Sequence, residues 1–192
     1  MSDAGRVISG SARGVRLGAP GPGTRPFADR VKQTLFAILE PDLPGARFLD
    51  LFAGSGAGGI EALSRGAAAA TFVERDPGAA SVIEANLRAA GLAGPSAVVV
   101  RADAVSWLGR SPVAGAPFDL VIVDPPYAEI DLLTRTLAAL GAGDAPLAPD
   151  ARVVAKHFWR DRPPDRIGLL ASERDRRFGE TALTFYRREE DR

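Results

Sequence analysis

The stretch Phe48-Leu-Asp-Leu-Phe-Ala-Gly-Ser-Gly-Ala-Gly-Gly59 decides the fold of this chain. An apolar run over 48–52 leads into a glycine-rich segment with the spacing G-x-G-x-x-G, which opens a predicted helix. Glu74 follows Gly54 by 20 residues, at the end of the next predicted strand. Glycines let a ligand approach the backbone, and an acid at this spacing accepts hydrogen bonds from a ribose diol. The pattern fits NAD, FAD or S-adenosylmethionine, and its structural alternative is a glycine-rich turn packed against a sheet.

The same alternation of strand and helix continues along the chain. Continuous apolar strands separated by amphipathic segments indicate a parallel sheet covered on both faces. These strands are predicted at 48–52, 70–73, 97–100, 118–123 and 151–155. Beyond them, 169–174 and 181–187 predict two antiparallel strands that close the sheet. We therefore expect an α/β fold with a doubly wound, mostly parallel, seven-stranded Rossmann-like sheet and an antiparallel C-terminal hairpin.

An N-terminal extension precedes this core. Segments 6–9 and 14–17 predict a small β-hairpin, and the apolar spacing over 27–40 predicts an amphipathic helix. A chain of 192 residues fits one domain. Within that single domain we expect 1–46 to be a basic extension and 47–192 to be the ligand-binding core.

Composition excludes several classes of protein. The chain has no Cys and one His, which argues against disulfide frameworks, thiolate zinc sites and Ser-His-Asp hydrolases. No apolar run approaches the roughly 20 residues that a membrane helix needs, so a soluble, cytoplasmic protein without a membrane or metal partner is expected. The net charge is zero, but 1–35 carries six basic and two acidic residues, and 151–192 carries eleven and eight. Two basic ends around an acidic middle leave a polyanionic partner open.

Two acids beside the glycine-rich segment narrow the choice of ligand. Asp50 precedes the loop, where it would repel a diphosphate and stabilise an ammonium or sulfonium group. Asp103 ends the third predicted strand and could accept a hydrogen bond from an adenine amino group. The structural alternative for each is a carboxylate that faces solvent at a strand end.

The segment Asp124-Pro125-Pro126-Tyr127 ends the fourth predicted strand, at the sheet edge where ligands bind. Two prolines remove two backbone donors and restrict φ, so their carbonyls point outward. The Asp124 carboxylate and a backbone carbonyl can therefore converge on an NH₂ group, and Tyr127 offers a face on which a base stacks. The structural alternative is a proline-rich turn with a packed Tyr.

Together these segments resemble a class I, S-adenosylmethionine-dependent amino-methyltransferase. The match is closer to the RsmD family, bacterial enzymes that methylate a guanine N2 of 16S ribosomal RNA. That resemblance rests on residues along nearly the whole chain: 6–10, Arg13-Gly14, Arg25-Pro26, 29–31, Leu35-Phe36, 61–67, 178–181 and Phe185-Tyr186. The chain departs from the family at Phe27, where Thr is usual, and at Lys156-His157, which follow the fifth predicted strand where an acidic residue is common.

The resemblance implies a set of roles, residue by residue. The cofactor S-adenosylmethionine would contact Asp50, Phe52, Ala53, Gly54, Gly56, Glu74, Asp103 and Ala104. Asp50 would lie near its amino group, Glu74 would bind the ribose hydroxyls, and Asp103 with Ala104 would meet the adenine. The catalytic residues would be Asp124, Pro125, Pro126 and Tyr127. The Asp124 carboxylate and the Pro125 carbonyl would hold the guanine N2.

The resemblance also implies an RNA partner, 16S ribosomal RNA within the assembled small subunit, bound by a monomer. Candidate phosphate contacts are Arg13, Arg16, Arg25, Arg30 and Lys32, for which the alternative is a solvated surface. His157 and Trp159 are expected to be packing or surface residues.

Three other functions stay open on the sequence. A DNA adenine-N6 methyltransferase would use the same Asp-Pro-Pro-Tyr segment, but the chain has no separate domain to read DNA. An NAD-dependent oxidoreductase is disfavoured because Tyr-x-x-x-Lys and a catalytic His are missing. A non-catalytic RNA-binding factor is disfavoured because the Asp124 to Tyr127 segment is intact.

Overall fold

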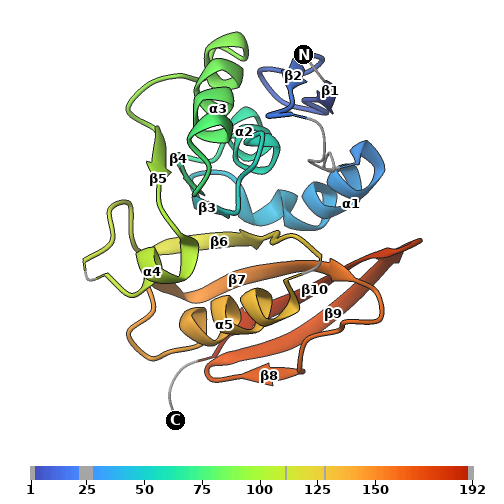
Figure 1. Ribbon diagram of the computed structural model, residues 1–192, viewed down its shortest axis with the longest axis vertical. Helices are drawn as coiled ribbons and strands as arrows, with labels where there is room; N and C mark the ends of the chain where they lie inside the picture. Colours follow the sequence, from blue (N-terminus) through green and yellow to red (C-terminus); the bar gives the residue numbers. More distant parts are fainter. Residues whose placement is uncertain (1–2, 22–27, 111, 128, 190–192) are drawn as a thin grey trace.

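The computed structural model describes residues 3–21, 28–110, 112–127 and 129–189 (Figure 1). Its strands are β1 (Asp3–Arg6), β2 (Arg16–Gly18), β3 (Arg47–Leu51), β4 (Ala69–Glu74), β5 (Ala97–Arg101), β6 (Phe118–Val123), β7 (Leu147–Phe158), β8 (Arg166–Ile167), β9 (Leu170–Phe178) and β10 (Thr181–Arg188). Its helices are α1 (Asp29–Leu39), the 3₁₀ turn η1 (Glu40–Asp42), α2 (Ala57–Ser64), α3 (Pro77–Ala89), α4 (Ala104–Leu108) and α5 (Ile130–Leu140).

Within the described residues, eight strands form one sheet in the order β5-β4-β3-β6-β7-β10-β9-β8. The first five in this order run parallel, and β10, β9 and β8 each pair antiparallel. The predicted fold class is confirmed, and the structure adds the two-residue strand β8. Because β3 pairs with both β4 and β6, the strand order reverses at β3. In open α/β sheets this switch point is where ligands bind.

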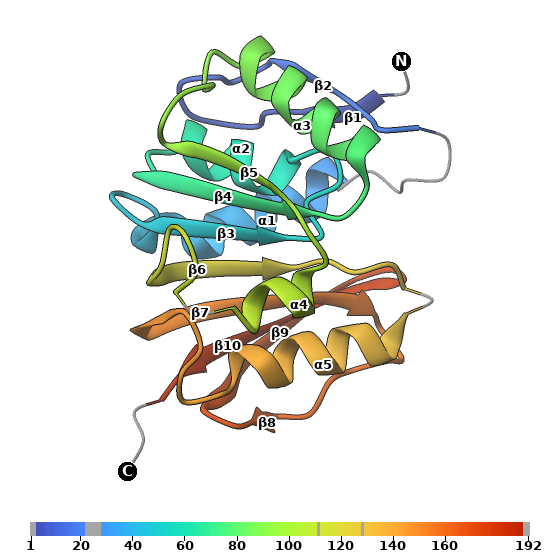
Figure 2. The ribbon, with the colours of Figure 1, turned by 60° about the vertical axis from the view of Figure 1, so that its left-hand side comes forward.

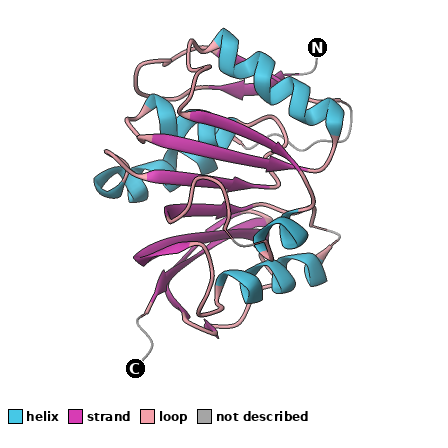
Figure 3. Ribbon diagram, turned by 90° about the vertical axis from the view of Figure 1, so that its left-hand side faces the viewer, coloured by secondary structure: helices cyan, strands magenta, loops and turns pink. Residues whose placement is uncertain are grey.

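Helices cover both faces of the sheet, as Figures 2 and 3 show. The helices α1, α2 and α3 and the β1–β2 hairpin lie on one face, and α4 and α5 lie on the other. Each face of the sheet has its own hydrophobic core. Because side chains alternate along a strand, Phe48 of β3 packs in the core on the side of α1, α2 and α3, and Leu49 packs in the core on the side of α4 and α5. Asp50 has the same parity as Phe48 and therefore faces the side of α2.

The N-terminal hairpin forms, with different strand limits from those predicted. Val7 and Val15 still bond through their backbones, since Val7 N donates to Val15 O at 2.9 Å. The predicted strand at 6–9 stops early because Ile8 N and Ser9 N donate to the Glu61 carboxylate, at 2.8 and 3.0 Å. A side chain of α2 thus replaces the partner strand. The helix predicted over 27–40 begins at Asp29 in the described part of the chain.

β7 is longer than the predicted strand 151–155. It runs for 12 residues because it pairs with β6 on one side and with β10 on the other. Lys156 and His157, which were expected after the strand, therefore lie inside it, opposite Leu183 and Ala182 of β10. Their backbone is therefore fixed by strand pairing with β10 and is not part of a loop.

The helices are short. The longest in the described ranges, α3, has 13 residues, and none there is both long and apolar enough to cross a bilayer.

Candidate active site

The carboxyl ends of β3, β4 and β6 lie side by side, and each has a carboxylate. Asp50 is the penultimate residue of β3, Glu74 ends β4, and Asp124 directly follows β6. Asp124 N donates to Leu51 O at 3.3 Å, which continues the pairing of β6 with β3 past the end of the strand. The fold therefore brings together, at its switch point, three acids that are far apart in the sequence.

The loop between β3 and α2 turns at three residues with positive φ: Phe52 (62°), Gly54 (55°) and Gly56 (76°). Such a φ is uncommon for a residue with a side chain, so Phe52 stores strain at this loop. Ala53 N donates to Val73 O at 3.1 Å and ties the loop to β4. A Cβ added at Gly54 would meet no atom nearer than 3.9 Å, so the backbone is open to a ligand there.

Two other glycines of the motif are required by packing. A Cβ at Gly59 would lie 2.3 Å from the Phe72 ring, and a Cβ at Gly58 would lie 2.9 Å from the Asp50 carboxylate. Both are closer than real Cβ contacts. Gly58 and Gly59 therefore seat α2 against the sheet.

Asp50 is nearly buried, with 4% of its surface exposed. Burial raises the pKa of Asp50 to about 8, the hydrogen bond from Gly59 N (2.7 Å) opposes the rise, and repulsion from Asp124 and Glu74 adds to it. Three acids thus act on one space at the switch point. A cationic group placed there is stabilised, whereas a diphosphate is repelled.

Glu74 and Asp103 are held by backbone N–H groups. Glu74 accepts from Gly54 N at 2.8 Å and from Asp76 N at 2.9 Å. A carboxylate has about four lone-pair positions, so acceptor capacity remains for a diol. Asp103 caps α4 by accepting from Ser106 N at 2.9 Å, and that hydrogen bond lowers its pKa. Its side chain is exposed at the same edge.

These residues fit S-adenosylmethionine better than a dinucleotide. The open backbone at Gly54 gives room for the cofactor, and the acidic surroundings of Asp50 suit an ammonium or sulfonium group. Glu74 and Asp103, the latter followed by the buried Ala104, present fixed acceptors to a nucleoside. In the described part of the chain, no group of three or more His, Cys, Asp or Glu could hold a metal ion.

Asp124 is paired with a lysine from the neighbouring strand. Lys156 Nζ lies 2.6 Å from Oδ1 and 2.8 Å from Oδ2 of Asp124, and the lysine side chain is only 8% exposed. The pair is reached from solvent through Asp124, whose side chain is 22% exposed. This partnership was missed by sequence reasoning. The sequence offers one signal of it. Lys156 lies two residues after the apolar Val154, so in a strand it faces the core, where a charge needs a partner.

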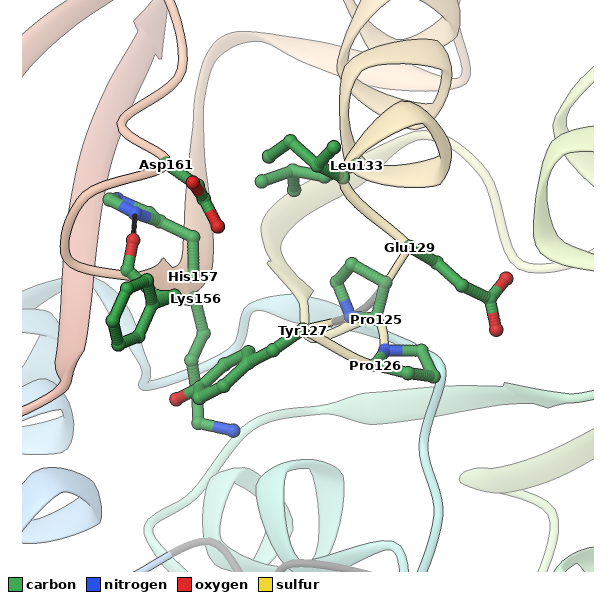
Figure 4. Close-up of a pocket in the computed structure, with 10 residues that line it drawn as sticks. Pro125, Pro126, Tyr127, Glu129, Leu133, Lys156, His157 and Asp161 are labelled. Atoms are coloured by element: carbon green, nitrogen blue, oxygen red, sulfur yellow. Dashed lines mark hydrogen bonds between the residues drawn. The ribbon is translucent and has the colours of Figure 1, made fainter.

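Tyr127 lies beside this pair, in the pocket that Figure 4 shows. Its hydroxyl is 2.7 Å from Thr181 Oγ1 of β10, and Lys156 Nζ lies 5.2 Å from the centre of its ring. Pro125 is buried and Pro126 is exposed. Pro125, Pro126 and Tyr127 therefore line this pocket together with Lys156, and Asp124 adjoins it through its ion pair with Lys156.

His157 lines the same pocket but has structural partners. Its Nε2 lies 2.9 Å from Thr184 Oγ1, and its Nδ1 lies 2.8 Å from Phe158 O. Burial lowers the pKa of His157, which favours the neutral ring. Both ring nitrogens are therefore engaged, and the contact of Nε2 with Thr184 links β7 to β10.

The arginines predicted to contact RNA phosphates lie on the surface where they are described. Arg13, Arg16 and Arg30 are all at least partly exposed, and Arg16 forms an ion pair with Asp3 at 3.0 Å. Arg25 lies outside the described residues.

Lys32 is a correction to the predicted phosphate contacts. Its side chain has no exposed surface, and its Nζ donates to Arg6 O at 2.5 Å and lies 3.7 Å from the Glu61 carboxylate. Burial lowers its pKa, and attraction to Glu61 partly offsets the shift. Because Glu61 also accepts from Ile8 N and Ser9 N, the pair anchors the hairpin to α2 and cannot reach a phosphate.

Comparison with known proteins supports the same interpretation. The family described as "Conserved hypothetical protein 95" matches residues 5–187. The ribosomal RNA small subunit methyltransferase D of Escherichia coli K12 is 38% identical over 185 residues, covering 96% of this chain and 90% of the relative. The solved structure of yhhF from Escherichia coli superposes with a TM-score of 0.83 and is 36% identical, covering 96% of this chain and 97% of that one. A hypothetical protein from Thermus thermophilus has a TM-score of 0.78, 33% identity, and coverage of 94% and 97%.

Proposed function

Because this chain belongs to the Conserved hypothetical protein 95 family, as its resemblance to RsmD enzymes predicted, we propose that it methylates a guanine N2 in 16S ribosomal RNA. The methyl donor is S-adenosylmethionine. The observation that carries the proposal is the placement of the Asp124 to Tyr127 segment beside an acidic, glycine-lined switch point. An electron-rich acceptor for an amino group thus adjoins a space suited to a cationic methyl donor.

The cofactor would be held by the residues of the β3, β4 and β5 ends. Asp50 would face its ammonium group, Glu74 its ribose hydroxyls, and Asp103 with Ala104 its adenine, while Phe52, Ala53, Gly54 and Gly56 form the loop beneath it. When bound, S-adenosylmethionine supplies an electrophilic methyl group. The chain's task is to align the acceptor nitrogen with that group, because alignment supplies much of the rate of such a displacement.

Asp124 and Pro125 act on the guanine amino group. A carboxylate oxygen and the Pro125 carbonyl accept its two N–H bonds, and this leaves the nitrogen lone pair directed away from both acceptors. Tyr127 stacks on the ring, which offsets part of the few kcal/mol that taking a base out of its stack costs.

Lys156 holds the Asp124 carboxylate in place, since it bonds both oxygens. The remaining lone pairs of the carboxylate stay available to the substrate. The amino nitrogen gains the methyl carbon and loses one proton, which the partly exposed Asp124 can pass to water. No histidine base takes part.

The N-terminal extension, 1–46, is proposed to bind RNA through Arg13, Arg16, Arg25 and Arg30, and 47–192 to bind the cofactor and perform the reaction. The assembled small subunit is the proposed substrate, a monomer the active form, and the cytoplasm the place of action. Hydrogen bonds from Gly18 N to Asn86 Oδ1 (2.8 Å) and from Asn86 Nδ2 to Ser55 O (2.8 Å) tie the hairpin to the glycine loop. RNA bound to the extension would thereby lie beside the cofactor loop.

The proposal is tested by incubating the protein with isotopically labelled S-adenosylmethionine and three substrates: undermethylated small subunits, naked 16S RNA and unmethylated DNA. Digestion to nucleosides and mass spectrometry identify the product. We expect labelled N2-methylguanosine from subunits or RNA, and its loss in Asp124→Asn. Asp119→Asn is the matched control, because Asp119 lies at the other end of β6. Labelled N6-methyladenine from DNA would contradict the guanine assignment, and retained activity in Asp124→Asn would contradict the site.

A further inference from the structure

We propose that a second RNA-binding surface lies on the C-terminal hairpin and holds the phosphates of the RNA strand next to the target base. We call it the β9 surface and define it by Trp159, Arg160, Arg174, Arg176 and Arg177. Because side chains alternate along a strand, Arg177 lies with Trp159 on one face of the edge strand β9 and Arg174 and Arg176 lie on its other face, so this surface wraps around the edge. This inference rests on the proposed function, because it assigns a binding surface to the RNA strand that leads into the same active site. The N-terminal extension lies on a different part of the fold (Figure 1).

The arginines of the β9 surface lack acidic partners, unlike others of the same region. Arg152, Arg162 and Arg187 each form ion pairs with acids at 2.5 to 2.8 Å. By contrast, all four arginines of the β9 surface are exposed, and none lies within 4.0 Å of a carboxylate in the described ranges. Guanidinium groups without a carboxylate partner are available to phosphates, which they can bind through two hydrogen bonds.

Trp159 positions two of these groups. The Cζ atom of Arg177 lies 3.6 Å from the centre of the Trp159 ring, and that of Arg160 lies 4.9 Å away. Arg177 Nε also donates to Gly179 O at 3.0 Å. A guanidinium stacked on an aromatic ring loses less conformational freedom when it binds an anion, so the ring prepares both arginines for phosphates.

The turn between β9 and β10 connects the β9 surface to the proposed base site. Trp159 N donates to Glu180 O at 3.0 Å, and the Tyr127 hydroxyl lies 2.7 Å from Thr181 Oγ1. The rings of Tyr127, Phe158 and Trp159 follow one another, with centres 6.5 and 6.3 Å apart. In Figure 1 this turn lies on the side where β6 and β7 end. A strand whose base stacks on Tyr127 therefore passes the β9 surface.

A purely structural explanation of these arginines is edge protection. Beyond Ala171, β9 pairs only with β10 among the described strands, and charges on such a strand hinder pairing with other molecules. Edge protection requires charge but not two guanidinium groups ordered on a Trp ring. Among the nearby acids, Glu173 is paired with Arg152 and Arg187, and Asp175 is paired with Arg162. Asp161 and Glu180 remain against the four arginines, which leaves a positive surface. RNA is the occupant that this charge and its place favour.

The test compares Arg176→Gln/Arg177→Gln with the control Arg47→Gln/Arg110→Gln. Arg47 and Arg110 are also exposed arginines, and Arg47 begins β3 at the opposite end of the sheet. The measurement is the affinity for a fluorescein-labelled, mixed-sequence, single-stranded RNA at several salt concentrations. Losing two phosphate contacts should lower the slope of log affinity against log salt by about 1.4. The control should keep the slope of the unaltered protein.

A second readout locates the contact. Trp107 is a buried residue of α4, so a change in tryptophan fluorescence on adding this RNA reports on Trp159, and Trp159→Phe should abolish it. For methylation of small subunits, KM should rise in the β9 variant while kcat is retained. An unchanged salt slope and KM would overturn the proposal. So would increased light scattering by the variant with unchanged RNA affinity, which would establish edge protection. If the unaltered protein made no N2-methylguanosine, the proposed function would fail, whereas methylation with unchanged RNA binding by the variant would contradict the β9 surface alone.

Discussion

The protonation of Asp50 predicts how the stability of this protein depends on pH. Its pKa is about 8 in the folded protein, against 3.8 for an unperturbed Asp. The folded protein therefore binds this proton more tightly than the unfolded chain does. Between those two values folding takes up one proton, so the free energy of unfolding falls as pH rises.

One proton corresponds to about 1.4 kcal/mol per pH unit, so Asp50 alone should remove about 3 kcal/mol between pH 5 and pH 7. Asp50→Asn removes the titration and retains an oxygen that can accept from Gly59 N. The difference in pH dependence between the protein and this variant isolates the residue, because other titrating groups contribute equally to both.

The assay is urea unfolding followed by circular dichroism at pH 5, 6 and 7. From pH 5 to pH 7, we expect the unfolding free energy of the unaltered protein to fall by about 3 kcal/mol relative to that of Asp50→Asn. Parallel curves for the two proteins would refute the reasoning, since they would mean that Asp50 titrates alike when folded and unfolded. A second measurement follows the ligand. S-Adenosylmethionine should release a proton from Asp50 at pH 7, detected by calorimetry in buffers of different ionisation enthalpy, and Asp50→Asn should release none.

Three substitutions test other parts of the structure. Lys156→Met should lower kcat for methyl transfer by about tenfold or more, because Asp124 is no longer held in place and a rise of about 1.4 kcal/mol in the activation free energy slows a reaction tenfold. Cofactor affinity, measured by calorimetry, should stay unchanged. Gly59→Ala should lower the unfolding free energy by about 1–3 kcal/mol, because its Cβ would overlap the Phe72 ring, and a urea midpoint equal to that of the unaltered protein would contradict the packing. Lys32→Met should cost about 1–3 kcal/mol, because Arg6 O loses its buried donor while Glu61 keeps its ion pair with Arg65 at 2.8 Å, and amide hydrogen exchange should show the N-terminal hairpin opening first.

Most of the fold could be predicted because its signals are local. The strand 118–123 agrees with β6 residue for residue, since an apolar run bounded by turn residues leaves little choice of limits. The hairpin at 6–17 was predicted with the wrong limits because Glu61, far along the chain, takes the N–H groups of Ile8 and Ser9. β7 was predicted too short because pairing with β10 extends it.

The candidate site divides in the same way. Sequence reasoning placed Asp124 and Tyr127 at a strand end, and the structure has them there. It did not predict that Lys156 holds Asp124 or that Lys32 is buried. Both depend on which strand or helix packs beside which, and a residue type alone does not give that.

The amino-acid sequence by itself determined the order of strands and helices, the glycine-rich turn and the carboxylates at the strand ends. These follow from side-chain periodicity and backbone freedom, which act over a few residues. Only the tertiary structure decided that Asp50 is protonated near neutral pH, that Lys156 pairs with Asp124, and that Lys32 anchors the hairpin. Desolvation and ion pairing depend on distances between residues that lie far apart along the chain, and those distances exist only once the sheet has formed.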